Sequence, residues 1–425
     1  MKEEKNTGYE KIRIAEGIHL MLIPKDNYKS NVITVYIKRP LIREEATRNS
    51  LLPSVMRSAT ASWGSPAAIA KKLQSLYGTT TGVLAGKLGE RHILSFRMTS
   101  AADRYLPQPV FREALGVMKE ILTAPAVKEE GFLPEYLQIE KEILKEDILS
   151  KINDKGRYAV ERCIEIMCEN EPYGISGDGY IEDLDQITPR SLYEYYREVI
   201  RSSPIDIVVA GAFEREEVLQ CIREIFSFER GNLIRIPAED PNVAFESKKV
   251  EEAMDVTQGK LILAFRTGVD LLHEDYDAML LANAVLGGGA HSKLFLNVRE
   301  KHSLCYSIYS SMEKFKGLLM INAGIEIEDR EKAKSLILEQ LRDLQEGRIS
   351  EEEIRNARQY MRNGLMSLKD SLYSLGDFYY NQSLRDKNIT LEEMAENIAS
   401  VSKEDILRAA SKIRPDTEYF LTAKK

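Results

Sequence analysis

The sequence is poor in the residues that build metal centres. No two of its five histidines are spaced as H-x-x-H, H-x-x-E-H or H-E-x-x-H. These residues are His19, His92, His273, His291 and His302. A zinc site needs several imidazole, thiolate or carboxylate ligands at one point, and paired histidines on one helical face are its usual sign. We therefore expect this chain to bind no metal and to hold no cofactor.

Cysteines and long apolar runs are also scarce. The four cysteines form no C-x-x-C pair, so we expect buried free thiols. They are Cys163, Cys168, Cys221 and Cys305. Apolar stretches such as 207–213 are far shorter than the roughly 20 residues that span a bilayer. Residues 1–6 carry charges of both signs with no apolar region behind them, which predicts no secretory signal and a cytoplasmic location.

An excess of positive charge is missing as well. Lys and Arg total 59 against 67 for Asp and Glu, which gives a formal net charge of −8. A general nucleic-acid binder needs a clustered positive surface, so this class is excluded, although a local basic patch remains open. The composition that is present, with 43% hydrophobic and 30% charged residues over 425 positions, is typical of a globular protein with two or three domains.

The same order of elements occurs twice along the chain. Thr188 and Pro189 open a helix, and a buried strand follows at 204–211. Ser402, with Asp405 three positions later, opens a second helix that leads to a strand at 417–422. Helices that end near positions 78 and 306 also lead into strands. These matches, about half a chain apart, predict an internal duplication.

Each predicted half combines alternating strand patterns with amphipathic helices, which indicates α+β domains in which helices cover a sheet. The segment 229–248 is polar and contains two prolines, as is typical of a linker. We therefore expect an N-terminal domain at 1–228, a linker at 229–248 and a C-terminal domain at 249–425. Two such domains in one chain would leave a cleft between them.

The stretch 286–309 is the most informative part of the chain. Three consecutive glycines open it, a short amphipathic helix follows, and Arg299 and Tyr306 stand seven residues apart before a strand-like run. The glycines could cradle an anion, but close approach of two backbones is the simpler role. Spacing alone would make Arg299 an ion-pair partner of a nearby glutamate and Tyr306 an ordinary strand residue.

Residues 292–310 resemble the second-domain signature of the pitrilysin/insulinase peptidases, the family that includes the mitochondrial processing peptidase. First-domain residues that resemble the same family are Glu171-Pro-Tyr-Gly174, Gly179, Leu184 and Ile187-Thr188. The resemblance implies a clam-like α+β fold of two homologous domains. It also implies that Arg299 and Tyr306 bind substrate carbonyl groups, a role that suits a guanidinium and a phenol because both donate hydrogen bonds to an oxygen that gains charge.

Within that family, the segments 75–78 and 379–382 resemble the bacterial inactive-subunit type associated with elongation factor P 5-aminopentanol modification. Active members carry the zinc motif H-x-x-E-H on an early helix of the first domain. Alignment by the turn that follows places Ser50, Pro53 and Ser54 at its three positions. Serine is a poor neutral zinc ligand and proline cannot accept a proton, so the resemblance implies a degenerate metal site.

The family's third zinc ligand lies in a region where this chain has four acidic residues, whose simpler role is a solvated helix face. They are Glu140, Glu142, Glu146 and Asp147. The sequence as a whole predicts a chain that is inactive alone and forms the metal-free subunit of a heterodimeric zinc peptidase. A homologous partner with H-x-x-E-H would hold the zinc, and this chain would contribute Arg299 and Tyr306 to the peptide substrate.

Two alternatives stay open. The chain is a proteolytically inactive homodimer that binds a peptide or a protein, or it is a peptidase by itself with a rearranged metal site. The second alternative predicts stoichiometric zinc in the purified chain, whereas the heterodimer and the binding protein predict none.

Overall fold

The computed structural model describes residues 8–424, so residues 1–6, on which the expected absence of a signal rests, lie outside the described part. The described chain forms two compact units, each built from separate stretches of sequence. Unit 1 comprises the residues up to Leu149, Ile175–Pro237 and Leu368–Ile389. Unit 2 comprises Ser150–Gly174, Ala238–Ser367 and the residues from Thr390 onward.

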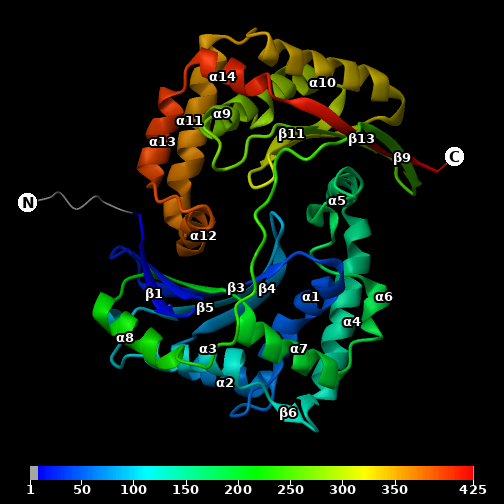
Figure 1. The fold of residues 1–425 in the computed structure, drawn as a ribbon. Coiled ribbons are helices and arrows are strands. Elements are labelled where there is room, and N and C mark those ends of the chain that lie inside the picture. Colours follow the sequence, from blue (N-terminus) through cyan, green and yellow to red (C-terminus); the bar gives the residue numbers. More distant parts are fainter. Residues whose placement is uncertain (1–7, 425) are drawn as a thin grey trace, which may run out of the picture. The chain divides into compact units, whose positions relative to one another are not determined.

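Unit 1 is organised around a six-stranded sheet with the order β1-β2-β8-β3-β5-β4 (Figure 1). Its strands are β1 (Glu10–Ala15), β2 (Ile18–Pro24), β3 (Ser30–Pro40), β4 (Thr80–Leu88), β5 (Arg91–Ala101) and β8 (Ile205–Gly211). β2 and β8 run parallel, and the other neighbours are antiparallel. A two-stranded ribbon of β6 (Val127–Lys128) and β7 (Gly131–Phe132) lies apart from this sheet.

The apolar residues of several helices form one core with the sheet of unit 1. The α-helices of the unit are α1 (Arg43–Ser58), α2 (Pro66–Ser75), α3 (Phe111–Thr123), α4 (Pro134–Ser150), α6 (Ile181–Leu184), α7 (Pro189–Ser202), α8 (Arg215–Ile225) and α12 (Leu372–Ser383). Short 3-10 turns are η1 (Asp103–Tyr105) and η6 (Leu368–Asp370). The predicted start of α7 is confirmed, because the Thr188 side chain accepts a hydrogen bond from the backbone N–H of Ser191 and Pro189 occupies the first helical position.

Unit 2 contains a five-stranded sheet with the order β11-β12-β10-β13-β9. Its strands are β9 (Lys248–Met254), β10 (Gly259–Arg266), β11 (Cys305–Glu313), β12 (Leu318–Ile325) and β13 (Arg414–Ala423). Its α-helices are α5 (Lys155–Met167), α9 (Tyr276–Gly287), α10 (Arg330–Gln345), α11 (Glu351–Ser367), α13 (Leu391–Ser400) and α14 (Lys403–Ala410). It also contains the π-helical segment η4 (Leu294–Lys301) and the 3-10 turns η2 (Lys151–Asn153), η3 (Pro172–Gly174) and η5 (Ile327–Asp329).

The two sheets share one topology. In each, a parallel pair (β2 with β8, β9 with β13) is followed by three antiparallel neighbours (β3, β5 and β4, or β10, β12 and β11). Only β1 in unit 1 has no counterpart among the described strands. The predicted α+β fold with an internal duplication is therefore confirmed.

The halves of the chain exchange one helix each. Helix α5, from the first half, packs on β10, β12 and β13 of unit 2, where Ala159, Cys163 and Met167 join the core beneath that sheet (Figure 1). Helix α12, from the second half, packs on β3 and β8 of unit 1, where Tyr380 stacks on Tyr36 with 3.7 Å between ring centroids. Helical periodicity shows which face of a helix is apolar but not which sheet it covers, so the predicted domains at 1–228 and 249–425 did not include this exchange.

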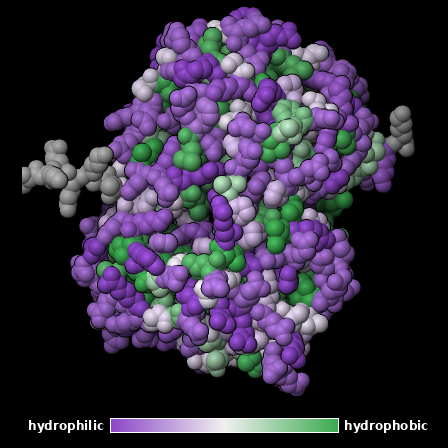
Figure 2. All heavy atoms as spheres, viewed as in Figure 1, coloured by the Kyte–Doolittle hydropathy of each residue, from purple (hydrophilic) through white to green (hydrophobic). Residues whose placement is uncertain are grey.

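The segment between the two halves is irregular. Residues 227–247 contain no helix or strand, and the chain passes from unit 1 to unit 2 between Pro237 and Ala238. No helix in residues 8–424 is long and apolar enough to cross a membrane. Figure 2 shows mainly hydrophilic side chains on the face in view, with hydrophobic residues in small separate groups. That face therefore offers no broad apolar surface.

His92 makes the stability of unit 1 depend on pH. It lies on β5, is fully buried, and burial lowers its pKa to about 4. A histidine whose pKa is lower in the folded chain than in the unfolded chain stabilises fully above about pH 6.5, and the stability falls as pH drops toward the folded pKa. We expect unit 1 to lose about 2 kcal/mol of unfolding free energy between pH 7 and pH 5 from this residue.

Urea unfolding at several pH values, followed for unit 1 by hydrogen exchange of the β5 amides, measures this loss. In His92→Leu the dependence between pH 7 and pH 5 should flatten. Leu94→Met, at a buried position of the same strand without a titratable group, serves as the control and should retain the slope. An unchanged slope in His92→Leu would show that other groups cause it.

Candidate functional site

Arg299 lies on the exposed side of η4. The segment is anchored by the buried Leu294 and Val298 and by a hydrogen bond from Asn297 Nδ2 to Gln340 Oε1 of 2.6 Å. The Arg299 side chain is 40% exposed, and its guanidinium carbon lies 4.7 Å from the centroid of the Phe295 ring. This cation–π contact orients the guanidinium without using its N–H donors.

Tyr306 is the second residue of the edge strand β11. The register with β12 shifts between Cys305 and Ser307, so Tyr306 lies in a bulge, which turns its side chain toward solvent. The side chain is 59% exposed, and its hydroxyl donates a hydrogen bond to the Glu326 carboxylate just beyond β12. That hydrogen bond raises the pKa of the Tyr306 phenol, so the group remains a donor at neutral pH.

Both donors lie in one corner of unit 2. The connection from η4 to β11 is closed by a hydrogen bond of 3.0 Å from the Ser303 N–H to the Arg299 carbonyl oxygen, with Ser303 at a φ of +53°. Burial raises the pKa of the Cys305 thiol to about 11, and the nearby Arg299 guanidinium opposes the rise. Within residues 8–424, no direct hydrogen bond joins Arg299 to Tyr306. The corner therefore presents the exposed Arg299 guanidinium beside an exposed phenol, and the Tyr306 O–H must leave Glu326 to donate to a substrate carbonyl oxygen.

The glycines before η4 place this corner against the sheet. A Cβ atom on Gly287, the last residue of α9, would lie 2.6 Å from the backbone nitrogen of Ser310 on β11. The helix and the strand thus approach more closely than any larger residue would allow, which agrees with the structural role expected for the glycines.

The three degenerate positions lie on α1. The Ser50 hydroxyl donates a hydrogen bond of 2.8 Å to the Gly177 carbonyl oxygen, and Pro53 is buried inside the helix. Ser54 is half-buried one turn before Ser58, whose hydroxyl lies 2.9 Å from Glu140 Oε1. The Ser50 hydroxyl is therefore held by a backbone carbonyl, and Pro53 has no side-chain atom that could bind a metal.

The acidic residues on α4 are bonded to other side chains or exposed to solvent. Glu140 contacts α1 through Ser58. Glu142 accepts a hydrogen bond from Gln138 on its own helix. Glu142, Glu146 and Asp147 are exposed. No group of three or more His, Cys, Asp or Glu side chains that could hold a metal occurs in the part of the chain that the structure describes.

Comparison with known proteins assigns this chain to a family. "Probable inactive metalloprotease YmfF" of Bacillus subtilis (strain 168) is 35% identical over 407 residues, which cover 95% of this chain and 96% of that relative. The family "Peptidase M16 inactive domain" matches residues 186–361. The chain belongs to the peptidase M16 family. The resemblance to the pitrilysin/insulinase peptidases is thereby confirmed.

Solved structures show the same M16 fold. A conserved protein from Enterococcus faecalis V583 superposes with a TM-score of 0.88 at 28% identity, over 98% of this chain and 99% of that one. The peptidase M16 inactive domain from Pseudomonas fluorescens superposes with a TM-score of 0.79 at 19% identity, over 98% of both chains. At that lower identity the likeness concerns the fold alone.

Zinc, which the resemblance implies for active M16 members, does not fit the residues of α1 in this chain. At the positions that the resemblance assigns to the motif, this chain has two serines and a proline, and Ser50 already donates its hydroxyl hydrogen to a backbone carbonyl. Neutral hydroxyls are weak ligands for Zn²⁺. We therefore derive no metal-dependent step from this chain.

Glu171, one of the residues that carry the family resemblance, lies in a buried cluster of charged side chains. It lies just before η3 and is buried between Arg266, at 2.5 Å, and Lys316, at 2.8 Å. Burial alone would raise the pKa of Glu171, but the hydrogen bonds from the two cations outweigh burial and lower the pKa. Asp416 completes the cluster at 2.7 Å from Arg266. The cluster fastens the exchanged segment 150–174 to the sheet of unit 2.

Sequence reasoning missed the residues that hold the donor pair. Phe295 stands four positions before Arg299, a spacing at which helical side chains meet, so this contact could have been predicted from the sequence. The contact of Glu326 with Tyr306 could not have been predicted from the sequence, because it depends on the pairing of Cys305 with Ile325 and on the bulge that follows. Strand register of this kind depends on tertiary pairing.

Proposed function

We propose that this chain is the non-metal-binding subunit of a two-chain M16 zinc peptidase. It would contribute Arg299 and Tyr306 to a peptide held at the H-x-x-E-H zinc site of a homologous partner. The observation that carries the proposal is the contrast between the two sets of residues. The metal positions on α1 cannot hold zinc, whereas the donor pair on η4 and β11 is exposed and oriented.

The physical reason for the pair is charge development on the substrate. When a peptide bond is attacked, its carbonyl oxygen gains negative charge, and oriented N–H and O–H donors stabilise that charge. Arg299 keeps its N–H groups available because its closest carboxylate, that of Glu300, is 3.9 Å away. Activation of water and positioning of the peptide are separable tasks, so two chains can share them.

The buried thiols support a reducing compartment for this activity. All four cysteines are buried thiols, which agrees with the sequence prediction and with the rarity of disulfides in the cytoplasm. We include a cytoplasmic location in the proposal on this ground.

The first test is assembly and metal partition. A mixture of this chain with an H-x-x-E-H homologue from the same cell should elute as a complex with one zinc per two chains. Mutation of the homologue's motif should remove all zinc, and this chain alone should bring less than about 0.1 zinc per chain through purification. Failure of the two chains to associate would leave the homodimeric binding protein as the better account. Stoichiometric zinc in this chain alone would favour the rearranged metal site.

A further inference from the structure

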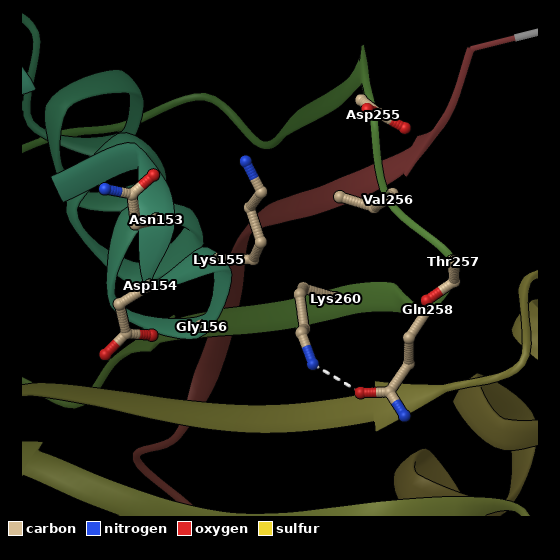
Figure 3. Close-up of a pocket in the computed structure, with 9 residues that line it drawn as sticks. All are labelled: Asn153, Asp154, Lys155, Gly156, Asp255, Val256, Thr257, Gln258 and Lys260. Atoms are coloured by element: carbon tan, nitrogen blue, oxygen red, sulfur yellow. Dashed lines mark hydrogen bonds between the residues drawn. The ribbon is translucent and has the colours of Figure 1, made fainter. Parts of the chain in front are cut away.

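A cavity of about 860 Å³ lies in unit 2 between the start of α5 and the loop that joins β9 to β10 (Figure 3). It opens at the end of the sheet where β10 and β11 begin and β12 ends. Its lining residues are Asn153, Asp154, Lys155, Gly156, Asp255, Val256, Thr257, Gln258 and Lys260. Tyr306 lies at the same end of the sheet, because its neighbour Ser307 pairs with Gly324 and Gly324 pairs with Lys260.

Polar side chains from two strands, β10 and β11, and from the loop between β9 and β10 meet beside Gly324 on β12. A Cβ atom on Gly324 would lie 3.0 Å from Ser307 Oγ, 3.0 Å from Gln258 Oε1 and 3.2 Å from Lys260 Nζ. The absence of a side chain at Gly324 leaves the space in which these groups converge. The Lys260 ammonium and the Ser307 hydroxyl can donate to an oxygen anion, whereas Gln258 presents its amide oxygen, which accepts from Lys260.

The charge of Lys260 is not matched by a carboxylate. Its ammonium donates to the neutral amide oxygen of Gln258, and no ion pair of Lys260 occurs in the described chain. Burial lowers its pKa, and Asp154 opposes this. The Asp154 carboxylate is used as the cap of α5, where it accepts a hydrogen bond of 3.0 Å from the Arg157 N–H.

The remaining charged groups agree with a site for an anion. The Lys155 ammonium has the Met254 sulfur, at 3.1 Å, as its partner. Figure 3 shows Lys155 and Lys260 between the start of α5 and the loop, with Asp154 at the start of α5 and Asp255 at the β9 end of the loop. Beside Gly324 a charged atom, the Lys260 ammonium nitrogen, lies within 4 Å of the open position, so a carboxylate bound there would contact Lys260.

We infer that this cavity binds a carboxylate of the peptide that Arg299 and Tyr306 hold, with Lys260 as its principal contact. The inference rests on the proposed function and adds a substrate class. β11 and β10 are separated by two strand spacings, about 10 Å, and an extended peptide covers that distance in about three residues. The recognised carboxylate is thus the C-terminus or an acidic side chain about three residues from the carbonyl at Tyr306.

The test compares peptides on this chain alone. Pools of fluorescently labelled random hexapeptides are prepared as free acids, as C-terminal amides, and as amides with aspartate fixed at the last position. Binding is followed by fluorescence anisotropy. We expect the free acids to bind about tenfold more tightly than the amides, because the amide removes a charge-assisted hydrogen bond. If the fixed aspartate restores the affinity, the site reads a carboxylate from either source; if it does not, the site reads the C-terminus.

Variants assign the preference to Lys260. Lys260→Met should abolish the difference between acids and amides, Lys260→Arg should retain most of it, and Lys332→Met on the exposed face of α10 should leave it unchanged. Equal affinity for acids and amides in the wild type, no binding of either pool, or a preference that survives Lys260→Met would each overturn the inference. These binding measurements do not include the partner. If this chain prefers carboxylates but does not raise peptide cleavage by the partner, the proposed function is rejected and the carboxylate site stands.

Discussion

Replacement of Glu171 by alanine should destabilise unit 2 by about 3–5 kcal/mol, the cost of leaving buried charges without their partner. Glu171 lies between Arg266 and Lys316, whose side chains are 3% and 0% exposed. Its loss would remove the carboxylate that the buried Arg266 guanidinium and Lys316 ammonium share, while Arg266 keeps Asp416 at 2.7 Å. Chemical unfolding followed by circular dichroism, with hydrogen exchange in β10 and β12, measures the change.

Glu169→Ala is the matched control for this replacement. Glu169 is two residues away and pairs with Lys248 at 2.8 Å, but its side chain is 57% exposed. An exposed pair contributes about 0–1 kcal/mol. Equal losses in the two variants would contradict the structural role of Glu171. The stabilisation by Glu171 should also be present above about pH 4.3 and be lost as the pH falls through its lowered pKa.

In a reconstituted complex, Arg299→Ala or Tyr306→Phe should each lower peptide turnover on the order of 10²-fold, as expected for loss of a donor to a developing oxyanion. Both side chains are exposed, and neither is part of a buried core, so assembly and unfolding free energy should change little. Steady-state cleavage of a fluorogenic peptide, with gel filtration of the same samples, separates turnover from assembly.

Tyr360→Phe provides the control for the loss of a phenol. Tyr360 lies on α11 of the same unit with 49% exposure, and it is not part of the donor pair. Its replacement should leave turnover unchanged. Full turnover in both Arg299→Ala and Tyr306→Phe would make these residues an ordinary ion-pair former and an ordinary strand residue.

The sequence predicted those features of the fold that depend on local patterns. The helix starts at Thr188 and Ser402 are confirmed as capping boxes because their hydrogen bonds join residues three positions apart. The duplication is confirmed because each half repeats the same order of elements. Exchange of α5 and α12 could not be predicted, since the two helices have equivalent places in the repeat and both have an apolar face to bury.

The candidate site was predictable only in part, for the same reason. Arg299 and Tyr306 were predicted from a local sequence signature, and the degenerate metal positions from alignment to the turn that follows them. The roles of all these residues remain predictions. Lys260 carried no sequence signal, because its relation to Ser307 exists only through the pairing of three strands across Gly324. Local patterns fix single elements, whereas a site built across a sheet depends on register.

The most direct test of the central claim is the rate of peptide cleavage by a zinc-loaded H-x-x-E-H homologue, measured with and without this chain at equal homologue concentration. If this chain supplies the donor pair, its addition raises turnover, and the double variant Arg299→Ala/Tyr306→Phe associates with the homologue but does not raise turnover. A mixture that cleaves peptide no faster than the homologue alone would contradict the account.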